Sequence, residues 1–414
     1  MVSLVQAGSS SPLLSAHPLN LRKRTVPAQL KVFEGPDVYR EQADAWHELL
    51  LRTEKKQELP SFFLQRAWLQ TWAEHYGKEK RLFLVVAENE DGQWIGGLPL
   101  VLGIGRVGRF KVPKLEMAGS PLVDCIGIPA VDRRARAETL KLILQWSQKE
   151  MKDWVAFEMR EIPIEDQVAE EIPRQAGQVH LPVFTKVCSK APLLDLEEFD
   201  ESGQKVSKNL RSNLKRRTKK LEKEGQVKKW FGFPEAEELD MLFSECCAVE
   251  AASWKADGEA RLLEGDSKPF IRSLWDRLSG KGDLAVGTIR LDGKLIAFHW
   301  GFRSNENRFL SYNLAYDSDF HNFSPGTLLM HHMAETGSSI GFRFLDASRG
   351  GLDHAHLLER YHGGSREHMS ATFYAPSFKA RSIQVLRHSL MPAARRVQER
   401  IRAMKPHKKA PVSA

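Results

Sequence analysis

The chain has 414 residues, 42% of them hydrophobic, and its 61 Lys and Arg residues against 53 Asp and Glu residues give a formal net charge of +8. This length allows two or three domains that each bury a core, and the hydrophobic content with ten tryptophans excludes a wholly disordered chain. The four cysteines (Cys125, Cys188, Cys246 and Cys247) form no C-x-x-C pair. They argue against a disulfide framework, structural zinc and thioredoxin-like chemistry, and indicate reduced thiols in a cytoplasmic protein.

Residues 1–31 are predicted to be a disordered leader. Residues 1–21 carry no formal charge, and Arg-Lys-Arg at 22–24 follows them instead of preceding them. A signal peptide has the opposite order, so it is the weaker interpretation. The chain contains no run of about 18 apolar residues, so we expect no membrane-spanning helix.

The first half mixes helices and strands. Apolar residues recur at helical spacing from Phe62 to Trp72, and two apolar runs flank a turn at 89–92, which is typical of a β-hairpin. The expected helices are 41–51, 62–76 and 136–151, and the expected strands flank the 89–92 turn and lie near 114–118 and at 154–159.

The second half repeats this order. Asp292-Gly293 joins two strands, 284–291 and 294–302, and a further strand is predicted at 308–316. Ser324-Pro325-Gly326 then opens a helix to about 339, with Ser324 as N-cap, and a last strand follows at 342–346. The two Asp-Gly turns lie 201 residues apart. This spacing predicts a duplicated α+β domain, unless common elements recur by chance.

Two segments hold the excess positive charge. Residues 206–225 form a predicted amphipathic helix with a Ser207 cap, and 376–414 form a second one, broken at Pro392. Eleven Lys/Arg and two Glu lie in 205–229, and ten Lys/Arg and one Glu in 376–414. Each segment therefore carries +9, which leaves an acidic remainder of −10.

An anionic partner is expected at these two segments: a nucleotide, a tRNA or an anionic membrane surface, unless they are only solvated faces. The first segment has no interleaved aromatics for base stacking, and duplex DNA is not expected.

Several motifs do not support the chemistry they suggest. Residues 103–108 match G-x-G-x-x-G, but a strand-like segment with Pro113 follows instead of a helix, so we expect a strand connection and no dinucleotide site. Asp353 to His356 is one short polar loop, so no metal is expected. The chain has no G-x-S-x-G nucleophile elbow, and Cys246-Cys247 indicates buried structural thiols.

The start of the helix at Ser324 is a candidate anion site. An uncharged helix start leaves backbone N–H groups that favour a phosphate, and Gly326 permits close approach. A well-capped core helix is the alternative.

Taken in order, these features resemble a known family. The landmarks span about 60 to 375 and are Phe62–Trp72, Leu210–Arg217, Ser253-Trp254-Lys255, Tyr316-Asp317, Ser324-Pro325-Gly326, and Phe344-Leu345-Asp346 with Gly350. The sequence resembles GNAT-superfamily acyltransferases of the CelD/FemAB-like type, which are associated with cellulose and other envelope polysaccharides.

The resemblance implies an α+β fold with tandem GNAT-like domains at 32–190 and 191–375, each a mixed twisted sheet flanked by helices. It places the acyl donor between the strands 308–316 and 342–346 of the second domain. An amine or hydroxyl would attack the donor's thioester or ester, and backbone N–H groups would stabilise the oxyanion.

The resemblance also implies roles for individual residues. Asp346 would be the base or orient the acceptor; the alternative is that it only caps the end of a strand. Tyr316 or Tyr361 would be the acid that protonates the leaving group; the alternative is that both tyrosines belong to the core. The expected donor-binding residues are Ser324, Pro325, Gly326 and Thr327, and the expected substrate- or anion-binding residues are Trp254, Lys255, Arg349 and Arg360.

Two departures from the family pattern matter. The coenzyme A loop is usually Q/R-x-x-G-x-G/A, but the sequence here is Asn-Phe-Ser-Pro-Gly-Thr at 322–327. The donors to consider are therefore acetyl-CoA or another acyl-CoA, acyl carrier protein, and aminoacyl-tRNA. Relatives carry a Tyr-Lys pair where His356-Leu357 stands here, so Arg360 would have to substitute or activity would be altered.

The predicted function is N- or O-acyl transfer to a sugar or other precursor in envelope or exopolysaccharide synthesis, in the cytoplasm or at the inner face of the membrane. The alternatives are a FemAB-type aminoacyl-tRNA-dependent ligase and a non-catalytic adaptor that docks on acidic lipid through the tail.

Overall fold

The computed structural model describes residues 28–54, 62–164, 168–202, 206–257, 261–350 and 356–391. Its strands are β1 (Gln29–Glu34), β2 (Arg81–Glu88), β3 (Trp94–Val107), β4 (Phe110–Met117), β5 (Ala156–Pro163), β6 (Val183–Asp195), β7 (Val227–Gly232), β8 (Leu284–Leu291), β9 (Lys294–Ser304), β10 (Arg308–Tyr316), β11 (Phe344–Asp346) and β12 (Gly364–Tyr374). Its α-helices are α1 (Val38–Glu41), α2 (Ala43–Glu54), α3 (Arg66–Tyr76), α4 (Arg133–Lys149), α5 (Val168–Gln178), α6 (Leu196–Ser202), α7 (Lys208–Leu221), α8 (Leu239–Ala251), α9 (Ser267–Leu278), α10 (Pro325–Thr336) and α11 (Phe378–Val385).

The expected leader lies mostly outside the described residues, although residues 29–31 belong to β1. None of the described helices is long and apolar enough to cross a bilayer.

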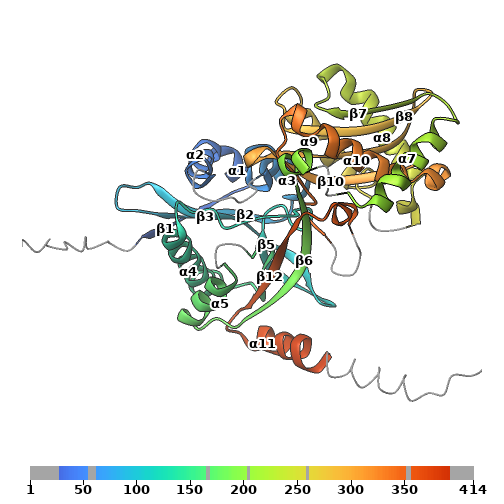
Figure 1. Ribbon diagram of the computed structural model, residues 1–414. Coiled ribbons are helices and arrows are strands. Elements are labelled where there is room, and N and C mark those ends of the chain that lie inside the picture. The colour runs from blue at the N-terminus through green and yellow to red at the C-terminus, as the bar shows by residue number, and fades with distance from the viewer. Residues whose placement is uncertain are drawn as a thin grey trace, which may run out of the picture.

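The twelve strands form one sheet in the order β1-β2-β3-β4-β5-β12-β6-β11-β10-β9-β8-β7 (Figure 1). In the first half, β1 to β4 pair antiparallel, and β4 then pairs parallel with β5. In the second half, β7 to β10 pair antiparallel, and β10 then pairs parallel with β11. The duplicated α+β arrangement is therefore confirmed.

The two halves exchange strands at the centre of the sheet. β12, from the end of the described chain, lies between β5 and β6, and β6 pairs in turn with β11 of the second half. Figure 1 shows β6 and β12 side by side in the middle of the molecule. The boundary expected between 190 and 191 falls inside β6, so the two halves are joined by hydrogen-bonded strands and not by a linker.

The hairpins form where the turn residues predict them. Gly92 and Gly293 adopt φ of +73° and +85°, values that a glycine reaches without steric cost. The G-x-G-x-x-G segment lies at the end of β3, and its last residue, Gly108, makes the turn to β4 with φ of +64°. It is a strand connection, as predicted.

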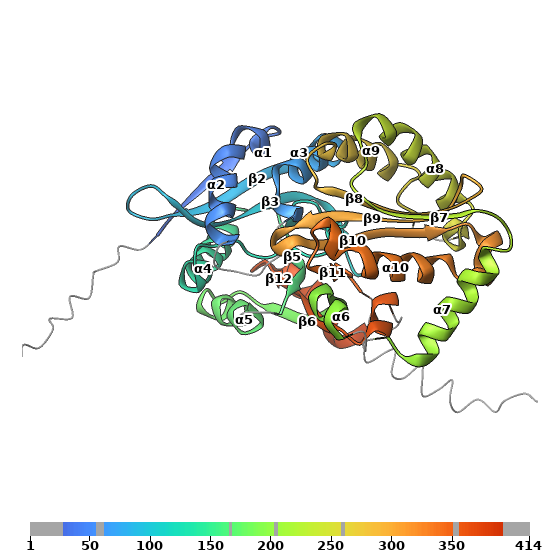
Figure 2. The same cartoon turned by 45° about the horizontal axis from the view of Figure 1, so that its top comes forward.

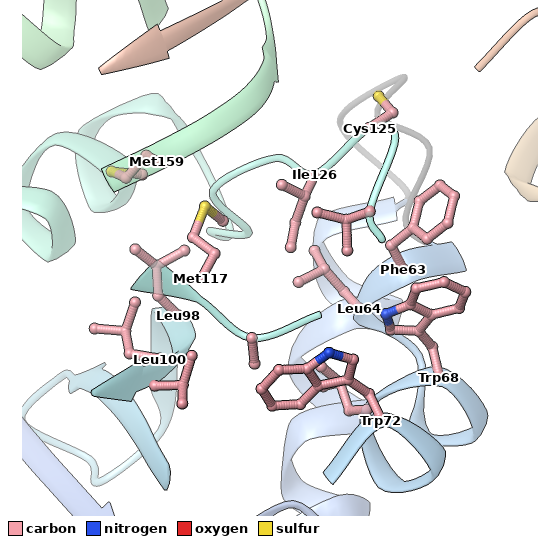
Figure 3. Close-up of a cluster of buried hydrophobic side chains, with 14 of the residues drawn as sticks. Phe63, Leu64, Trp68, Trp72, Leu98, Leu100, Met117, Cys125, Ile126 and Met159 are labelled. Atoms are coloured by element: carbon pink, nitrogen blue, oxygen red, sulfur yellow. The ribbon is translucent and has the colours of Figure 1, made fainter. Parts of the chain in front are cut away.

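Aromatic packing joins the halves into a shared core. The Phe62 ring stacks on Phe302 of β9 with centroids 3.9 Å apart, and Trp68 meets Phe270 of α9 edge-on at 5.2 Å. Figure 3 shows Phe63, Trp68 and Trp72 beside Ile126 in this cluster. A second, smaller cluster lies under α10, on the face of β8 and β9 opposite to α8 and α9 (Figure 2).

The predicted ends of two helices, α7 and α10, can be compared with the structure. Ser207 caps α7 by accepting a hydrogen bond from Leu210 N at 3.2 Å, as predicted. Ser324 precedes α10, but its side chain makes no cap, because φ of 52° and its N–H bond to His321 O close the preceding 3-10 turn (η5, Ser318–Phe323). The helix also ends at Thr336, before the expected 339.

The predicted tail helix begins as α11 and continues as a π turn, η8 (Leu386–Leu390). The expected break at Pro392 and the rest of the tail lie outside the described residues.

Candidate active site

The candidate site begins where two parallel strands part. β10 pairs with β11 only from Arg308 to Leu310, opposite Phe344 to Asp346, and β11 then ends. A β-bulge between Ser311 and Asn313 bends β10 at this point. Within the described part of the chain, β10 beyond Leu310 has a strand partner only on its β9 side. The backbone on the other side of β10 therefore faces the gap between the parted strands.

The start of α10 lies at the far end of this gap. A β-carbon added to Gly326 would be 3.5 Å from Tyr316 Cδ1 at the end of β10, and 3.7 Å from Leu357 Cδ1 in the 3-10 turn η7 (Leu357–Tyr361). Arg360 Nη1 in the same turn donates a hydrogen bond to Thr327 Oγ1 at 3.4 Å. The structure thus brings together Tyr316, the Ser324–Thr327 helix start and Arg360.

The two halves differ at the corresponding helix. α4 connects β4 with β5 as α10 connects β10 with β11, but the Asp132 carboxylate accepts a bond from Ala135 N at 2.8 Å and occupies the start of α4. No acidic residue lies in the first turn of α10, and no side chain caps it. An anionic group is therefore favoured at α10 and disfavoured at α4.

Asp346 lies at the point where the strands part, but it is fully buried in ion pairs. Its Oδ2 accepts from Arg308 at 3.1 Å and from Arg366 at 2.7 Å, and its Oδ1 accepts from Ser348 N at 2.7 Å. Burial alone would raise the pKa of Asp346, but Arg366 and Arg308 outweigh it and hold the pKa below its ordinary value. A carboxylate held in this way is a weak base, so the geometry favours a structural role over the predicted catalytic one.

The two candidate tyrosines differ in surroundings. Tyr361 is buried in the core under α10, its ring stacks near His331 at 6.1 Å, and burial raises its pKa well above the usual range. These surroundings match the core alternative. Tyr316 is only partly buried and borders the start of α10, so it is the better placed of the two.

Lys255 belongs to a buried polar cluster on the α8 side of β10. Its Nζ donates to Asn313 Oδ1 and lies 3.8 Å from Glu250 Oε1, which also accepts from Asn313 Nδ2 at 2.8 Å. Burial lowers the pKa of Lys255, although Glu250 opposes this effect. Trp254 beside it is exposed, so the predicted pair separates into one buried cation and one surface ring.

A histidine that sequence reasoning missed lies on the opposite face. His299 of β9 is buried with Nε2 2.6 Å from Ser311 Oγ, at the start of the bulge. Burial is the main cause that lowers the pKa of His299 to about 3, and the electrostatic effects of His356 and Lys255 act in the same direction. The ring is therefore neutral. Neither His299 nor Ser311 lies in a recognisable motif, and only the pairing of β9 with β10 brings them together.

A loop of the first half, between β4 and α4, supplies another group to this region. The Tyr312 hydroxyl of the β10 bulge donates to Leu122 O at 2.8 Å, and Arg349, just beyond β11, has Nη1 4.0 Å from Asp124 Oδ1. Arg349 Nε also lies 3.3 Å from Glu161 Oε1. Burial raises the pKa of Asp124 to about 7, although Arg349 opposes it. Sequence spacing carried no signal for Asp124, because it comes from the other half of the chain.

The remaining predicted features are simple to place. Cys246 is buried in α8 and Cys247 partly buried, and burial raises both thiol pKa values, which fits structural thiols. Across the ranges that the structure describes, no three His, Cys, Asp or Glu residues are arranged to hold a metal. Asp353, His354 and Ala355 of the candidate metal loop lie outside those ranges.

The parted parallel strands and the tandem sheet define a GNAT-like fold, and comparison with known proteins identifies the second half. Residues 208–356 match the family model described as an acetyltransferase (GNAT) domain. No curated protein matches the sequence. This match and the fold support an acyltransferase enzyme, and residues 208–356, less than half of the chain, are similar to a GNAT domain.

Solved structures share this fold over most of the chain. FemX is 10% identical and covers 86% of this chain and 100% of its own, with a TM-score of 0.54. A tandem GNAT protein from the clavulanic acid biosynthesis pathway is 12% identical and covers 84% and 100%, with a TM-score of 0.50. The C-terminal domain of a protein described as a lysylphosphatidylglycerol synthetase from Agrobacterium fabrum is 13% identical and covers 84% and 97%, also with a TM-score of 0.50. At these identities the likeness shows the fold alone.

Proposed function

We propose that the protein transfers an acetyl or other acyl group from acyl-coenzyme A to an amine or hydroxyl of a sugar or precursor in cell-envelope or exopolysaccharide synthesis. The observation that carries the donor assignment is the parting of β10 from β11 beside the uncapped start of α10, inside the segment that matches the GNAT model. GNAT domains use acyl-CoA as co-substrate. The envelope acceptor rests on the CelD/FemAB-like resemblance of the sequence.

The chain's own groups suit this donor. Pro325 has no N–H, and the Ser324 and Thr327 N–H groups donate to His321 O and Ser324 O. The Gly326 N–H at the positive end of α10 would therefore bind the diphosphate, and Arg360, which donates to Thr327 Oγ1, would add a positive charge. Arg360 thereby supplies a cation near the place where relatives carry the Tyr-Lys pair. Backbone N–H groups of β10 that face the gap would stabilise the oxyanion formed when the acceptor attacks the thioester carbon.

The acceptor's proton needs a base, and the candidate is Asp124, which lies 4.0 Å from Arg349 just beyond β11. Its pKa of about 7 lies near the working pH, where a general base is most effective, whereas Asp346 is held ionised by two arginines. Collapse of the intermediate breaks the carbon–sulfur bond, and the departing thiolate takes a proton. Tyr316, next to Gly326, is the candidate acid for that step.

Isothermal titration with acetyl-CoA tests the donor. We expect a dissociation constant between roughly 1 µM and 1 mM, the range typical of enzyme substrates. Acetyl-pantetheine, which lacks the diphosphate, is expected to bind at least about tenfold more weakly, because it cannot use the helix start. If acetyl-CoA does not bind, the donor is not coenzyme A. If both ligands bind equally, the diphosphate does not lie at α10.

The exposed face of α7 favours a second candidate, an aminoacyl-tRNA-dependent ligase of the FemAB type. Arg211, Lys215, Arg216 and Lys219 point to solvent on this helix. Lys220 Nζ lies 4.9 Å from the centre of the Phe323 ring, directly before Ser324. A polyanion bound along α7 would therefore reach the donor site at its end.

Charge reversal on α7 separates the two candidates. The double substitution Lys215→Glu and Arg216→Glu changes two exposed side chains. For a coenzyme A enzyme, we expect the affinity for acetyl-CoA to change by less than about twofold, because exposed charges at a distance are screened. A ligase would instead lose about tenfold or more in tRNA affinity in a filter-binding assay. The matched control reverses Arg109 and Lys111, exposed on the β3–β4 hairpin, and should change neither affinity.

A further inference from the structure

The last described helix is firmly attached to the sheet on one side. Ala380 and Ile383 of α11 are buried in the main core. In the π turn that follows, the His388 ring stacks on Phe184 of β6 at 3.8 Å, and His388 Nε2 lies 2.7 Å from the Tyr374 hydroxyl of β12. Figure 1 shows α11 below β12 and β6, on the side away from α8 and α9. These contacts determine which face of α11 points outward.

The outward face carries exposed apolar side chains. Phe378 is 88% exposed and Val385 46% exposed, and residues seven positions apart lie on the same side of a helix. Leu390 in the π turn is exposed as well, at 56%, and so is Phe184 of β6, the ring on which His388 stacks, at 40%. Single exposed apolar residues are ordinary on a protein surface, but a group that includes an almost wholly exposed phenylalanine indicates a binding surface.

Positive charge surrounds these apolar side chains. Lys379 and Arg381 of α11 are exposed beside Phe378, and exposed Lys186 lies two residues from Phe184 on the same face of β6. From 376 to 414 the sequence contains ten Lys/Arg and one Glu. A second copy of the chain would bring two such positive segments together, which is unfavourable. Aliphatic side chains do not stack on bases, so a nucleic acid would gain nothing from Val385 or Leu390.

We propose that α11, the π turn and the adjoining part of β6 form a docking face for an anionic lipid bilayer. Phe378 and Val385 enter the interfacial region, while Lys379, Arg381 and Lys186 attract the lipid phosphates. This pairing of a few inserted apolar side chains with basic charge is the combination that holds peripheral proteins on membranes. The docking face does not depend on the acyl donor or acceptor, so its test is independent of the test of the proposed activity.

Vesicle co-sedimentation of the full chain tests the docking face. We expect binding to vesicles of one part phosphatidylglycerol to three parts phosphatidylcholine, and little binding to phosphatidylcholine alone. The substitutions Phe378→Ser and Val385→Ser together should lower partitioning about tenfold, because two apolar side chains no longer leave water. Lys379→Gln with Arg381→Gln should weaken binding and reduce its salt dependence. Met241→Ser is the matched control, since Met241 is equally apolar and 61% exposed on α8, and it should bind as the wild type does.

Several outcomes would overturn the proposal. Wild-type protein that binds neither type of vesicle, or both equally, excludes an anionic bilayer as the partner. If the Phe378/Val385 variant binds the vesicles as well as the wild type does, the two apolar side chains do not contribute, and charge alone accounts for the binding. An oligomer in sizing experiments that the same variant dissociates, without vesicle binding, would make the face an interface between copies of the chain.

Discussion

Replacing Gly326 by Asp is expected to abolish acyl-CoA binding, with a loss of affinity of about 100-fold or more. The new carboxylate would stand in the first turn of α10, where the donor's diphosphate is proposed to bind, and both groups are negative. The backbone accepts a β-carbon at this position, because it would meet only ordinary contacts, 3.5 Å from Tyr316 Cδ1 and 3.7 Å from Leu357 Cδ1, and circular dichroism checks that the variant folds. Titration with acetyl-CoA measures the effect.

Gly326→Ala is the control for this experiment. It adds the same β-carbon without the charge, so its affinity should stay within about threefold of the wild type. If Ala and Asp weaken the binding of acetyl-CoA equally, the loss comes from steric exclusion by the β-carbon and not from charge. If neither weakens binding, the donor does not lie at the start of α10, and the placement of the diphosphate is wrong.

Replacing Asp346 by Ala is expected to destabilise the fold by about 3–5 kcal/mol, because it leaves two buried guanidinium groups without their carboxylate. Asp346, Arg308 and Arg366 are all buried, and both arginines bind the same oxygen, Oδ2. Urea denaturation measures the free energy of unfolding. Glu306→Ala is the matched control, since it removes the more exposed partner of Arg308 and should cost less than about 1 kcal/mol.

The same ion pairs predict a dependence on pH. The pKa of Asp346 is lower in the folded than in the unfolded chain, so its contribution is fully present above the unfolded pKa and is lost as the pH falls through the folded value. Wild-type protein should therefore lose stability on acidification below about pH 4, and Asp346→Ala should lack this part of the loss. A variant as stable as the wild type but inactive would show that Asp346 acts in catalysis instead.

Local signals in the sequence determined much of the secondary structure. The Asp-Gly turns at Gly92 and Gly293 place both hairpins, because few residues other than glycine adopt positive φ readily. The strand expected at 308–316 has the bounds of β10, and Ser207 caps α7 as expected. These features depend on neighbours within a few residues, so composition and spacing suffice to predict them.

The landmarks of the proposed acyl donor site were also local. Ser324 precedes α10 and Pro325 is its first residue, since proline is favoured at the first helical position. The conformation of Ser324 was not predictable in this way. Its left-handed φ follows from the turn before it, which closes through His321 O.

Only the tertiary structure decided what surrounds that site. Asp346 was expected to act on the substrate, but Arg366 reaches it from β12, which the sheet places beside β6 after the strand exchange. Lys255 similarly meets Asn313, 58 residues further along the chain. Asp124, from the first half, reaches Arg349 just beyond β11.

The sequence by itself therefore determined the kinds of elements, their order, the duplicated plan and the helix start proposed to hold the donor's phosphates. The tertiary structure decided which charged groups are buried and which partners they meet. The physical reason is that the pairing of distant strands sets burial and charge neighbours, and these lower the pKa of Asp346 and raise the pKa of Asp124.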